Sequence, residues 1–262
     1  MKRETAAPFR RTFRSLALAL AFSVACTVEA PVAAVRGGGT VVVAWQQPET
    51  LHPLWSTGTQ TDVMIYSVAV EGLLRIDPDG EYLPALARDV PTFANGGVRM
   101  DGSSMVVTYR LRPGIRWSDG VPLTSDDVRY TWRTIMTDPR VSSREGYALI
   151  EDVEASDELT AVVRYRAAYV AYLTRFATIV PRHVLERGEA AALEYSRAPV
   201  GTGPFRITEH ASGDHITAER NPSYRVAGRP LLDRIVFRSV SSVQAAKAQL
   251  RAGEVQVSAS LS

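Results

Sequence analysis

Few residues of this chain have the type and spacing that catalysis requires. Cys26 is the only cysteine, and no Gly-x-Ser-x-Gly segment occurs, so neither a cysteine nor a serine hydrolase template has a nucleophile in context. The four histidines, His52, His183, His210 and His215, are scattered and lack the H-x-x-x-H or paired-cysteine spacing of a zinc site. The sequence therefore predicts a protein without catalytic residues, metal site or cofactor.

Two acidic segments could suggest chemistry, but local structure explains both. Asp126 and Asp127 could form an acid/base pair, yet they follow Thr124 in a capping-box pattern, so a solvated helix N-terminus accounts for the two carboxylates. Residues 77–80 (DPDG) resemble the start of a calcium loop, although the closing glutamate of such a loop is missing. We interpret this segment as a type I turn.

Residues 201–204 and Trp117 also have a chemical and a structural interpretation. The segment 201–204 (GTGP) could cradle a phosphate, but it lacks the Gly-Lys-Ser/Thr ending and leads into a predicted strand, so we expect a hinge or crossover loop. Trp117 could line a ligand pocket. Because it lies in a W-S-D-G turn, we expect its ring to pack that turn against the core.

The elements that must position these residues alternate between strands and helices, which predicts a mixed α/β fold. The expected strands cover residues 40–44, 73–76, 104–111, 151–155, 160–165, 205–209, 215–220, 235–238 and, at its start, 254–257. One expected helix begins at a cap formed by Asp62, and the chain leaves it at Gly72. A second begins at the Thr124 capping box and ends before Pro139. Further helices are expected near residues 168–176, 183–187 and 241–252.

The N-terminus has the pattern of a signal peptide. Arg10, Arg11 and Arg14 precede an uncharged apolar run, residues 15–25 (SLALALAFSVA). This run is too short to span a bilayer, which takes about 20 residues. We expect residues 1–25 to direct export and to be removed.

Cys26 stands at the expected cleavage point. Small residues directly before a cysteine resemble a bacterial lipobox, although Ser23 stands where lipoboxes usually have leucine. Lipidation at Cys26 would anchor the protein to a membrane face, whereas the alternative is an ordinary signal peptide with an incidental cysteine. Residues 26–39, with Pro31, three alanines and three glycines, have no apolar face to bury and are expected to form a tether.

The charge distribution argues against a nucleic-acid partner. Residues 1–36 contain six basic and two acidic residues, so the formal net charge of +2 becomes about −2 for residues 37–262. A weakly acidic body with interleaved basic residues has no stripe that could follow a phosphate backbone.

The order of the motifs resembles the family 5 bacterial extracellular solute-binding proteins, which serve transporters for oligopeptides, dipeptides, nickel complexes and opines. The resemblance extends from about residue 40 to the end of the sequence. It is carried by residues 71–74 (EGLL) with the D-x-D-G turn after them, 111–128 (LRPGIRWSDGVPLTSDDV), 200–205 (VGTGPF), 219–224 (ERNPSY) leading to 232–237 (LDRIVF), and 250–255 (LRAGEV).

The resemblance implies a two-lobed α/β receptor of the periplasmic-binding-protein type II kind. Residues 40–262 would be lobe I, with a mixed-sheet core of about 41–56 and 157–262 and an inserted β-rich subdomain of about 57–156. By the same resemblance, the second lobe is expected to be absent from this chain, which would stop before lobe II.

The resemblance also implies a function and four ligand-binding residues. Thr57, Gly58 and Thr59, in the loop after the first strand, and Tyr147, after the signature helix, match positions that contact the ligand backbone in peptide binders of this family. The implied protein is the monomeric binding component of an ABC importer, which delivers peptides or similar solutes to permease subunits from the periplasm or the outer face of the cytoplasmic membrane. Two alternatives stay open, an envelope lipoprotein with a structural or chaperone role and an exported peptide hydrolase.

Overall fold

The computed structural model describes residues 37–258 of the chain. The predicted signal peptide, Cys26 and residues 26–36 of the predicted tether lie outside the described residues. Among the described helices, none combines the length and the apolar character that crossing a membrane requires.

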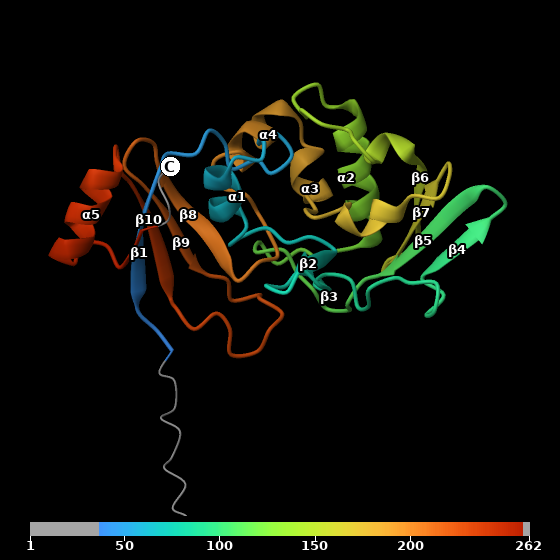
Figure 1. Ribbon diagram of the computed structural model, residues 1–262, viewed down its shortest axis with the longest axis horizontal. Coiled ribbons are helices and arrows are strands. Elements are labelled where there is room, and N and C mark those ends of the chain that lie inside the picture. Colours follow the sequence, from blue (N-terminus) through green and yellow to red (C-terminus); the bar gives the residue numbers. More distant parts are fainter. Residues whose placement is uncertain (1–36, 259–262) are drawn as a thin grey trace, which may run out of the picture. The chain divides into compact units, whose positions relative to one another are not determined.

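Strands from both ends of the described chain build the first sheet, in the order β11-β1-β10-β9-β8 (Figure 1). β1 (Thr40–Trp45) runs parallel to both of its neighbours, β10 (Arg234–Ser239) and β11 (Val257–Ser258). β9 (His215–Arg220) and β8 (Phe205–Ala211) extend the sheet as antiparallel strands. The chain therefore brings its first and last described strands into direct contact.

The β-branched run of β1 is covered on both faces, as its composition predicts. Because successive side chains of a strand point to opposite faces, Trp45 and Ala44 pack into different clusters. Trp45 packs with residues of α1 (Gln60–Tyr66), and Ala44 packs with residues of α5 (Val243–Ala252). The two helices thus bury opposite faces of the central strand.

The second sheet is antiparallel and comes from the middle of the chain. Its order is β4 (Val98–Asp101), β5 (Ser104–Arg110), β7 (Thr160–Tyr165) and β6 (Ile150–Asp157). α2 (Ser125–Thr137) packs against β6 and β7. The strand predicted over residues 104–111 and the helix predicted from the capping box are both confirmed.

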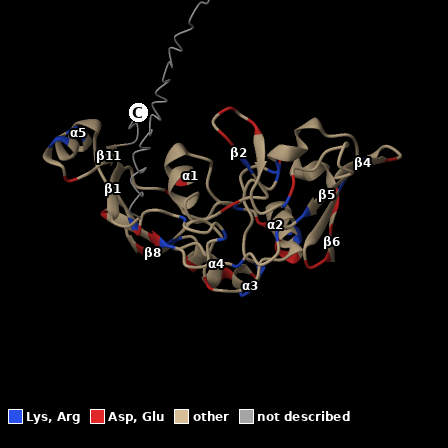
Figure 2. Ribbon diagram, turned by 90° about the horizontal axis from the view of Figure 1, so that it is seen from below, with Lys and Arg blue, Asp and Glu red and all other residues tan. Residues whose placement is uncertain are grey.

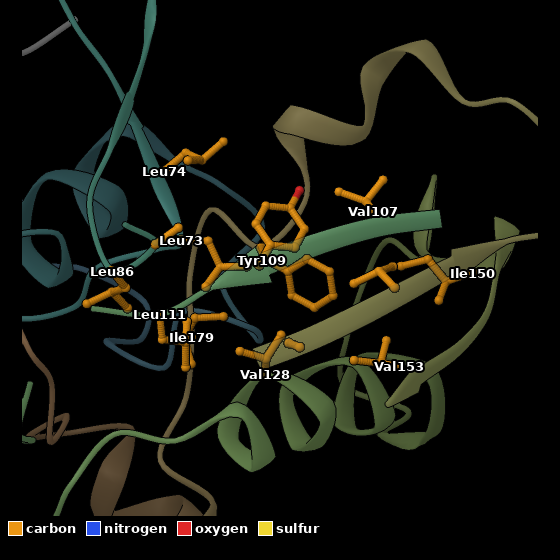
Figure 3. Packing of buried hydrophobic residues seen from close by; sticks show 14 of the residues in the cluster. Leu73, Leu74, Leu86, Val107, Tyr109, Leu111, Val128, Ile150, Val153 and Ile179 are labelled. Carbon is orange, nitrogen blue, oxygen red and sulfur yellow. The ribbon is translucent and has the colours of Figure 1, made fainter. Parts of the chain in front are cut away.

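The largest apolar cluster lies around this second sheet. Figure 3 shows Tyr109 of β5, Val153 of β6 and Val128 of α2 converging on one core, and none of the three side chains is exposed. Burying each side chain of this size contributes about 1.5–3 kcal/mol to the stability of the fold. The core therefore fixes α2 on the sheet, and with it the loop that follows α2.

Short elements connect the two sheets. They are β2 (Leu74–Ile76), β3 (Tyr82–Pro84), η1 (Tyr147–Leu149), η2 (Val170–Thr174), α3 (Arg182–Leu185) and α4 (Glu189–Tyr195). The helix predicted near residues 168–176 is only the 3₁₀ segment η2, and α4 was not expected from the sequence. α4 is short and is held by tertiary packing of its buried Ala192 and Tyr195 against α3.

The start of α1 differs from the prediction. Thr59 is the N-cap, since its Oγ1 accepts a hydrogen bond from the Asp62 N–H at 3.2 Å. Asp62 lies in the first turn, where its side chain is fully buried. The helix ends at Tyr66, before the predicted exit at Gly72, because the chain turns there to meet residues 201–203.

Residues 77–80 and 201–204, for which the sequence also suggested a calcium loop and a phosphate cradle, have structural roles. At residues 77–80 the Gly80 N–H donates to the Asp77 carbonyl at 3.0 Å, which is the predicted turn. At residues 201–203 the backbone packs so tightly that a Cβ on Gly201 would lie 1.9 Å from the Ala69 carbonyl oxygen. Glycine is needed there for this close approach.

Charges of both signs are interleaved over the first sheet (Figure 2). Glu219 of β9 lies 3.6 Å from Arg206 of β8 and 3.1 Å from Arg234 of β10. These are exposed cross-strand pairs, each of which contributes little to stability.

Asp127 is buried, which corrects the expectation of a solvated carboxylate pair at the start of α2. Asp127 is 4% exposed. Its Oδ2 accepts from the Thr124 N–H at 2.9 Å and from Trp117 Nε1 at 3.4 Å, and its Oδ1 accepts from the Arg182 N–H at 2.9 Å. Asp126 is half-exposed and pairs with Arg129. The predicted packing role of Trp117 is confirmed, because its ring is fully buried.

We predict that Asp127→Ala lowers the free energy of unfolding by about 3 kcal/mol, because it leaves three donors without an acceptor in a buried place. Asp126→Ala is the matched control and should cost less than about 1 kcal/mol, since its ion pair is exposed. Urea denaturation followed by circular dichroism measures both. Equal losses for the two variants would contradict the role given to Asp127.

Candidate ligand-binding site

The loops that follow β1 and α2 border a hollow of about 260 Å³. Its lining comes from three stretches that are distant in the sequence, within residues 53–58, 135–147 and 177–178. Three of the predicted ligand-binding residues, Thr57, Gly58 and Tyr147, belong to this lining. The structure thus brings these three together, although 89 positions separate Gly58 from Tyr147.

Thr59, the fourth predicted residue, does not line this hollow. Its hydroxyl is engaged as the N-cap of α1. Thr59 therefore positions the loop that carries Thr57 and Gly58, and its own contact with a ligand stays a prediction.

No residue that lines the hollow carries a charged side chain. The polar groups that it offers are hydroxyls and backbone groups, including those of Ser142 and Thr178. Among the described residues, the backbone N–H and C=O groups of Ala177 and Thr178 have no hydrogen-bond partner in the protein. The hollow can therefore make hydrogen bonds to a neutral polar group, with apolar contacts from Leu54 and Val141 around it.

Tyr147 holds one wall of the hollow in place. Its hydroxyl oxygen accepts a hydrogen bond from the Phe176 N–H at 2.7 Å, and the two rings meet edge to face at 5.5 Å. Burial raises the pKa of Tyr147, so the hydroxyl keeps its proton and can still donate it. Phe176 has a φ of 56°, an unfavourable conformation for a bulky residue, which these contacts stabilise.

Asp62 organises the loop after β1. One carboxylate oxygen accepts from the Glu49 N–H at 3.0 Å, and the other accepts from Ser56 Oγ at 2.8 Å. Ser56 Oγ in turn accepts from the Gly58 N–H at 3.0 Å. The buried carboxylate thus fixes the backbone of Gly58 at the hollow through one intervening hydroxyl.

A stack of three side chains supports the same loop from behind. The His52 ring lies parallel to the Trp55 ring, with centroids 4.0 Å apart, and the Arg140 guanidinium lies 3.7 Å from the centroid of the Trp55 ring. Trp55 Nε1 donates to Asp138 Oδ2 at 3.0 Å. The Tyr195 ring closes the inner end, with its centroid 5.0 Å from the centroid of the His52 ring and the two ring planes 72° apart. Burial lowers the pKa of His52 to about 3, so this ring is neutral near pH 7.

Sequence reasoning missed Asp62, Trp55 and Arg140 as residues that shape the hollow. Asp62 was assigned a cap, which is a local role, and its buried contacts with the preceding loop depend on how that loop folds back. Trp55 and Arg140 are 85 positions apart, and no spacing rule connects them. An aromatic residue in a polar loop was the only available signal.

The histidines lie in separate environments. His183 pairs with Asp119 at 2.7 Å, His215 with Asp214 at 2.9 Å, and His210 Nδ1 lies 3.1 Å from the Arg197 carbonyl oxygen. Within residues 37–258, no three or more His, Cys, Asp and Glu residues are grouped so that they could hold a metal ion.

Comparison with known proteins identifies related sequences. The model of the bacterial extracellular solute-binding proteins, family 5 (middle region) matches residues 81–262. Protein XP55 of Streptomyces lividans is 30% identical over 260 residues, which cover 94% of this chain and 46% of that protein. The oligopeptide-binding protein AppA of Bacillus subtilis is 27% identical over 231 residues, 84% of this chain and 40% of that protein. The chain spans less than half the length of these curated relatives.

Solved structures show the same fold. AppA in complex with a nonapeptide superimposes with a TM-score of 0.72 at 26% identity, covering 84% of this chain and 44% of AppA. MoaA of A. tumefaciens R10 in complex with mannopinic acid gives a TM-score of 0.72 at 25% identity, covering 86% and 45%. The predicted fold class, a mixed α/β arrangement of the periplasmic-binding-protein type II kind, is confirmed.

The buried His52 makes stability depend on pH. Between its ordinary pKa of 6.5 and its folded pKa of about 3, the unfolded chain binds a proton at His52 and the folded chain does not. Acidification through this window therefore lowers the free energy of unfolding. His52→Phe keeps a ring against Trp55 but removes the titration.

We predict that the wild-type protein loses about 3 kcal/mol more than His52→Phe between pH 6.5 and about pH 4, since each pH unit contributes about 1.4 kcal/mol. Urea denaturation at several pH values measures the difference. Parallel stability curves for the two proteins would show that His52 titrates in the folded state as it does in the unfolded chain.

Proposed function

Because the chain belongs to the family 5 bacterial extracellular solute-binding proteins, we propose that it binds a peptide or a similar small solute at the hollow and serves an ABC importer by delivering that solute to its permease. The observation that carries the proposal is the neutral, hydrogen-bonding lining formed by Thr57, Gly58, Tyr147 and the unpaired backbone of residues 177–178. These residues are the proposed ligand contacts, together with Thr59 as a predicted neighbour.

The chemistry of the lining suits a peptide backbone. An extended peptide is bound largely through main-chain hydrogen bonds, with pockets for its side chains. The backbone N–H groups of Ala177 and Thr178 can form such bonds, and the apolar residues Leu54 and Val141 can contact a ligand side chain. The relative AppA was crystallised with a nonapeptide, which supports a peptide, whereas MoaA with mannopinic acid leaves an opine as the alternative.

We further propose the domain division that the resemblance implies. The first sheet uses strands from residues 40–45 and 205–258, which agrees with a core of about 41–56 and 157–262. Of the second sheet, β4, β5 and nearly all of β6 fall in the inserted subdomain of about 57–156, whereas β7 (Thr160–Tyr165) falls in the segment 157–262 although it pairs between β5 and β6. We therefore place β7 with the inserted subdomain and move the expected boundary from about residue 156 to after residue 165. The hollow takes residues from both segments.

The test is a titration of the ¹⁵N-labelled full chain with N-acetyl-trialanine amide, followed by NMR. The amides of Gly58, Ser142 and Ala177 should shift together, with a dissociation constant on the order of 1 mM, because a shallow hollow offers few contacts. Tyr147→Phe should weaken binding about fivefold, since it removes the acceptor that positions the Phe176 backbone.

Tyr224→Phe is the matched control for Tyr147→Phe, because Tyr224 is also half-buried but does not line the hollow. It should bind like the wild type. If the amides of the hollow fail to respond to peptides and to opines alike, the receptor function is wrong, and a structural envelope lipoprotein becomes the better interpretation.

We also propose export through residues 1–25 and lipid attachment at Cys26, which would place the protein in the periplasm or on the outer face of the cytoplasmic membrane as a monomer. The sequence pattern supports this location, and the family is described as extracellular. Labelled palmitate should enter the wild-type protein in a bacterial host, and Cys26→Ser should abolish at least about nine-tenths of the label, because the thiol is the acylated atom. Equal labelling of both proteins would contradict lipidation at Cys26.

A further inference from the structure

The hollow has two facing walls that come from different loops. One wall is the loop after β1, with Leu54, Thr57 and Gly58, and the other is the loop after α2, with Val141 and Ser142. The size of a group that fits between them depends on how these loops are held relative to each other. The contacts that join the two loops therefore set the width of the hollow.

The direct polar contacts between the loops all involve Trp55. Among the described residues, the only hydrogen bond from residues 46–59 to residues 138–147 runs from Trp55 Nε1 to Asp138 Oδ2, at 3.0 Å. The Arg140 guanidinium adds the stacking contact on the same ring, 3.7 Å from its centroid. By contrast, Arg144 donates only to carbonyl groups at the end of α2 and in the loop after it, those of Met136, Asp138 and Val141.

Arg140 supports this connection by binding Asp138, the acceptor of the Trp55 hydrogen bond. Its Nε and Nη2 donate to the two oxygens of Asp138 at 2.9 Å each, a bidentate contact that holds the carboxylate whose Oδ2 accepts from Trp55 Nε1. Its Nη1 donates to Glu189 Oε1 of α4 at 2.6 Å. Arg140 also holds the pKa of Asp138 at about 2, so the carboxylate is ionised at neutral pH.

The guanidinium suits this position for a physical reason. It is flat, so it can stack on an indole ring while its edge donates to a carboxylate, and an ammonium group cannot do both. The Arg140 side chain is 37% exposed, so the stack is not needed to fill the core. Its geometric effect falls on Val141 and Ser142, the next residues in the chain and part of the wall.

We infer that Arg140 is a positioning and specificity-determining residue, which sets the distance between the two walls of the hollow and thereby the size of the ligand side chain that fits. The inference rests on the proposed function. Arg140 acts through Trp55 and Asp138 and does not itself line the hollow.

The experiment compares two probes on the full chain, N-acetyl-Gly-Ala-Gly amide and N-acetyl-Gly-Leu-Gly amide, by the NMR titration described above. Arg140→Gln should change the ratio of the two dissociation constants about fivefold relative to the wild type, because the released wall admits side chains of different size. A variant that is merely less stable would weaken both probes by the same factor.

Arg164→Gln is the matched control, since Arg164 also pairs with an aspartate at 2.9 Å and its side chain is 38% exposed, but the pair lies on the second sheet. The control should keep the wild-type ratio. Trp55→Phe, which keeps a ring but loses the donor to Asp138, should shift the ratio in the same direction and serves as a second test if Arg140→Gln folds poorly.

An unchanged ratio in Arg140→Gln and Trp55→Phe, with both probes still bound, would overturn the role of Arg140 and leave the proposed function intact. If the wild-type chain binds neither probe, peptide binding at the hollow fails and the inference fails with it. A changed ratio confined to these two variants supports the inference.

Discussion

The buried Asp127 carboxylate joins the start of α2 to the Trp117 turn and to the start of α3. It receives hydrogen bonds from the indole of Trp117, from the backbone before α2 and from the backbone that starts α3. Burial raises the pKa of this carboxyl, and the three hydrogen bonds that it accepts oppose that shift. The arrangement orients α2, and the end of α2 leads into the loop that forms one wall of the hollow.

Close approach of backbones is the second constraint. Gly203 donates its N–H to the Ala69 carbonyl at 2.8 Å, and a Cβ on Gly72 would lie 2.3 Å from the Ala177 carbonyl oxygen. Such contacts need residues without a side chain, because any Cβ would force the segments apart. They bring the chain after α1 against residues 176–178, of which Ala177 and Thr178 line the hollow.

The hollow itself combines a neutral surface with a charged support. Its lining has only apolar, hydroxyl and backbone groups, while the ionised pair of Asp138 and Arg140 lies one layer behind, against Trp55. The separation of the ion pair from the lining has a physical reason. Ionic contacts give a rigid geometry with defined directions, and keeping them away from the lining leaves the ligand to bind through hydrogen bonds and apolar contact.

The sequence by itself determined the fold class, most of the strands, the turn at residues 77–80 and the local roles of Trp117 and Thr124, because these follow from short-range patterns of side-chain type. It also indicated Thr57, Gly58 and Tyr147 through the resemblance to the family. Only the tertiary structure decided that Asp127 is buried, that Asp62 holds the loop before it, and that Trp55 meets Arg140. These contacts join residues far apart in the chain, and burial and distance between such residues arise only when the separate elements pack together.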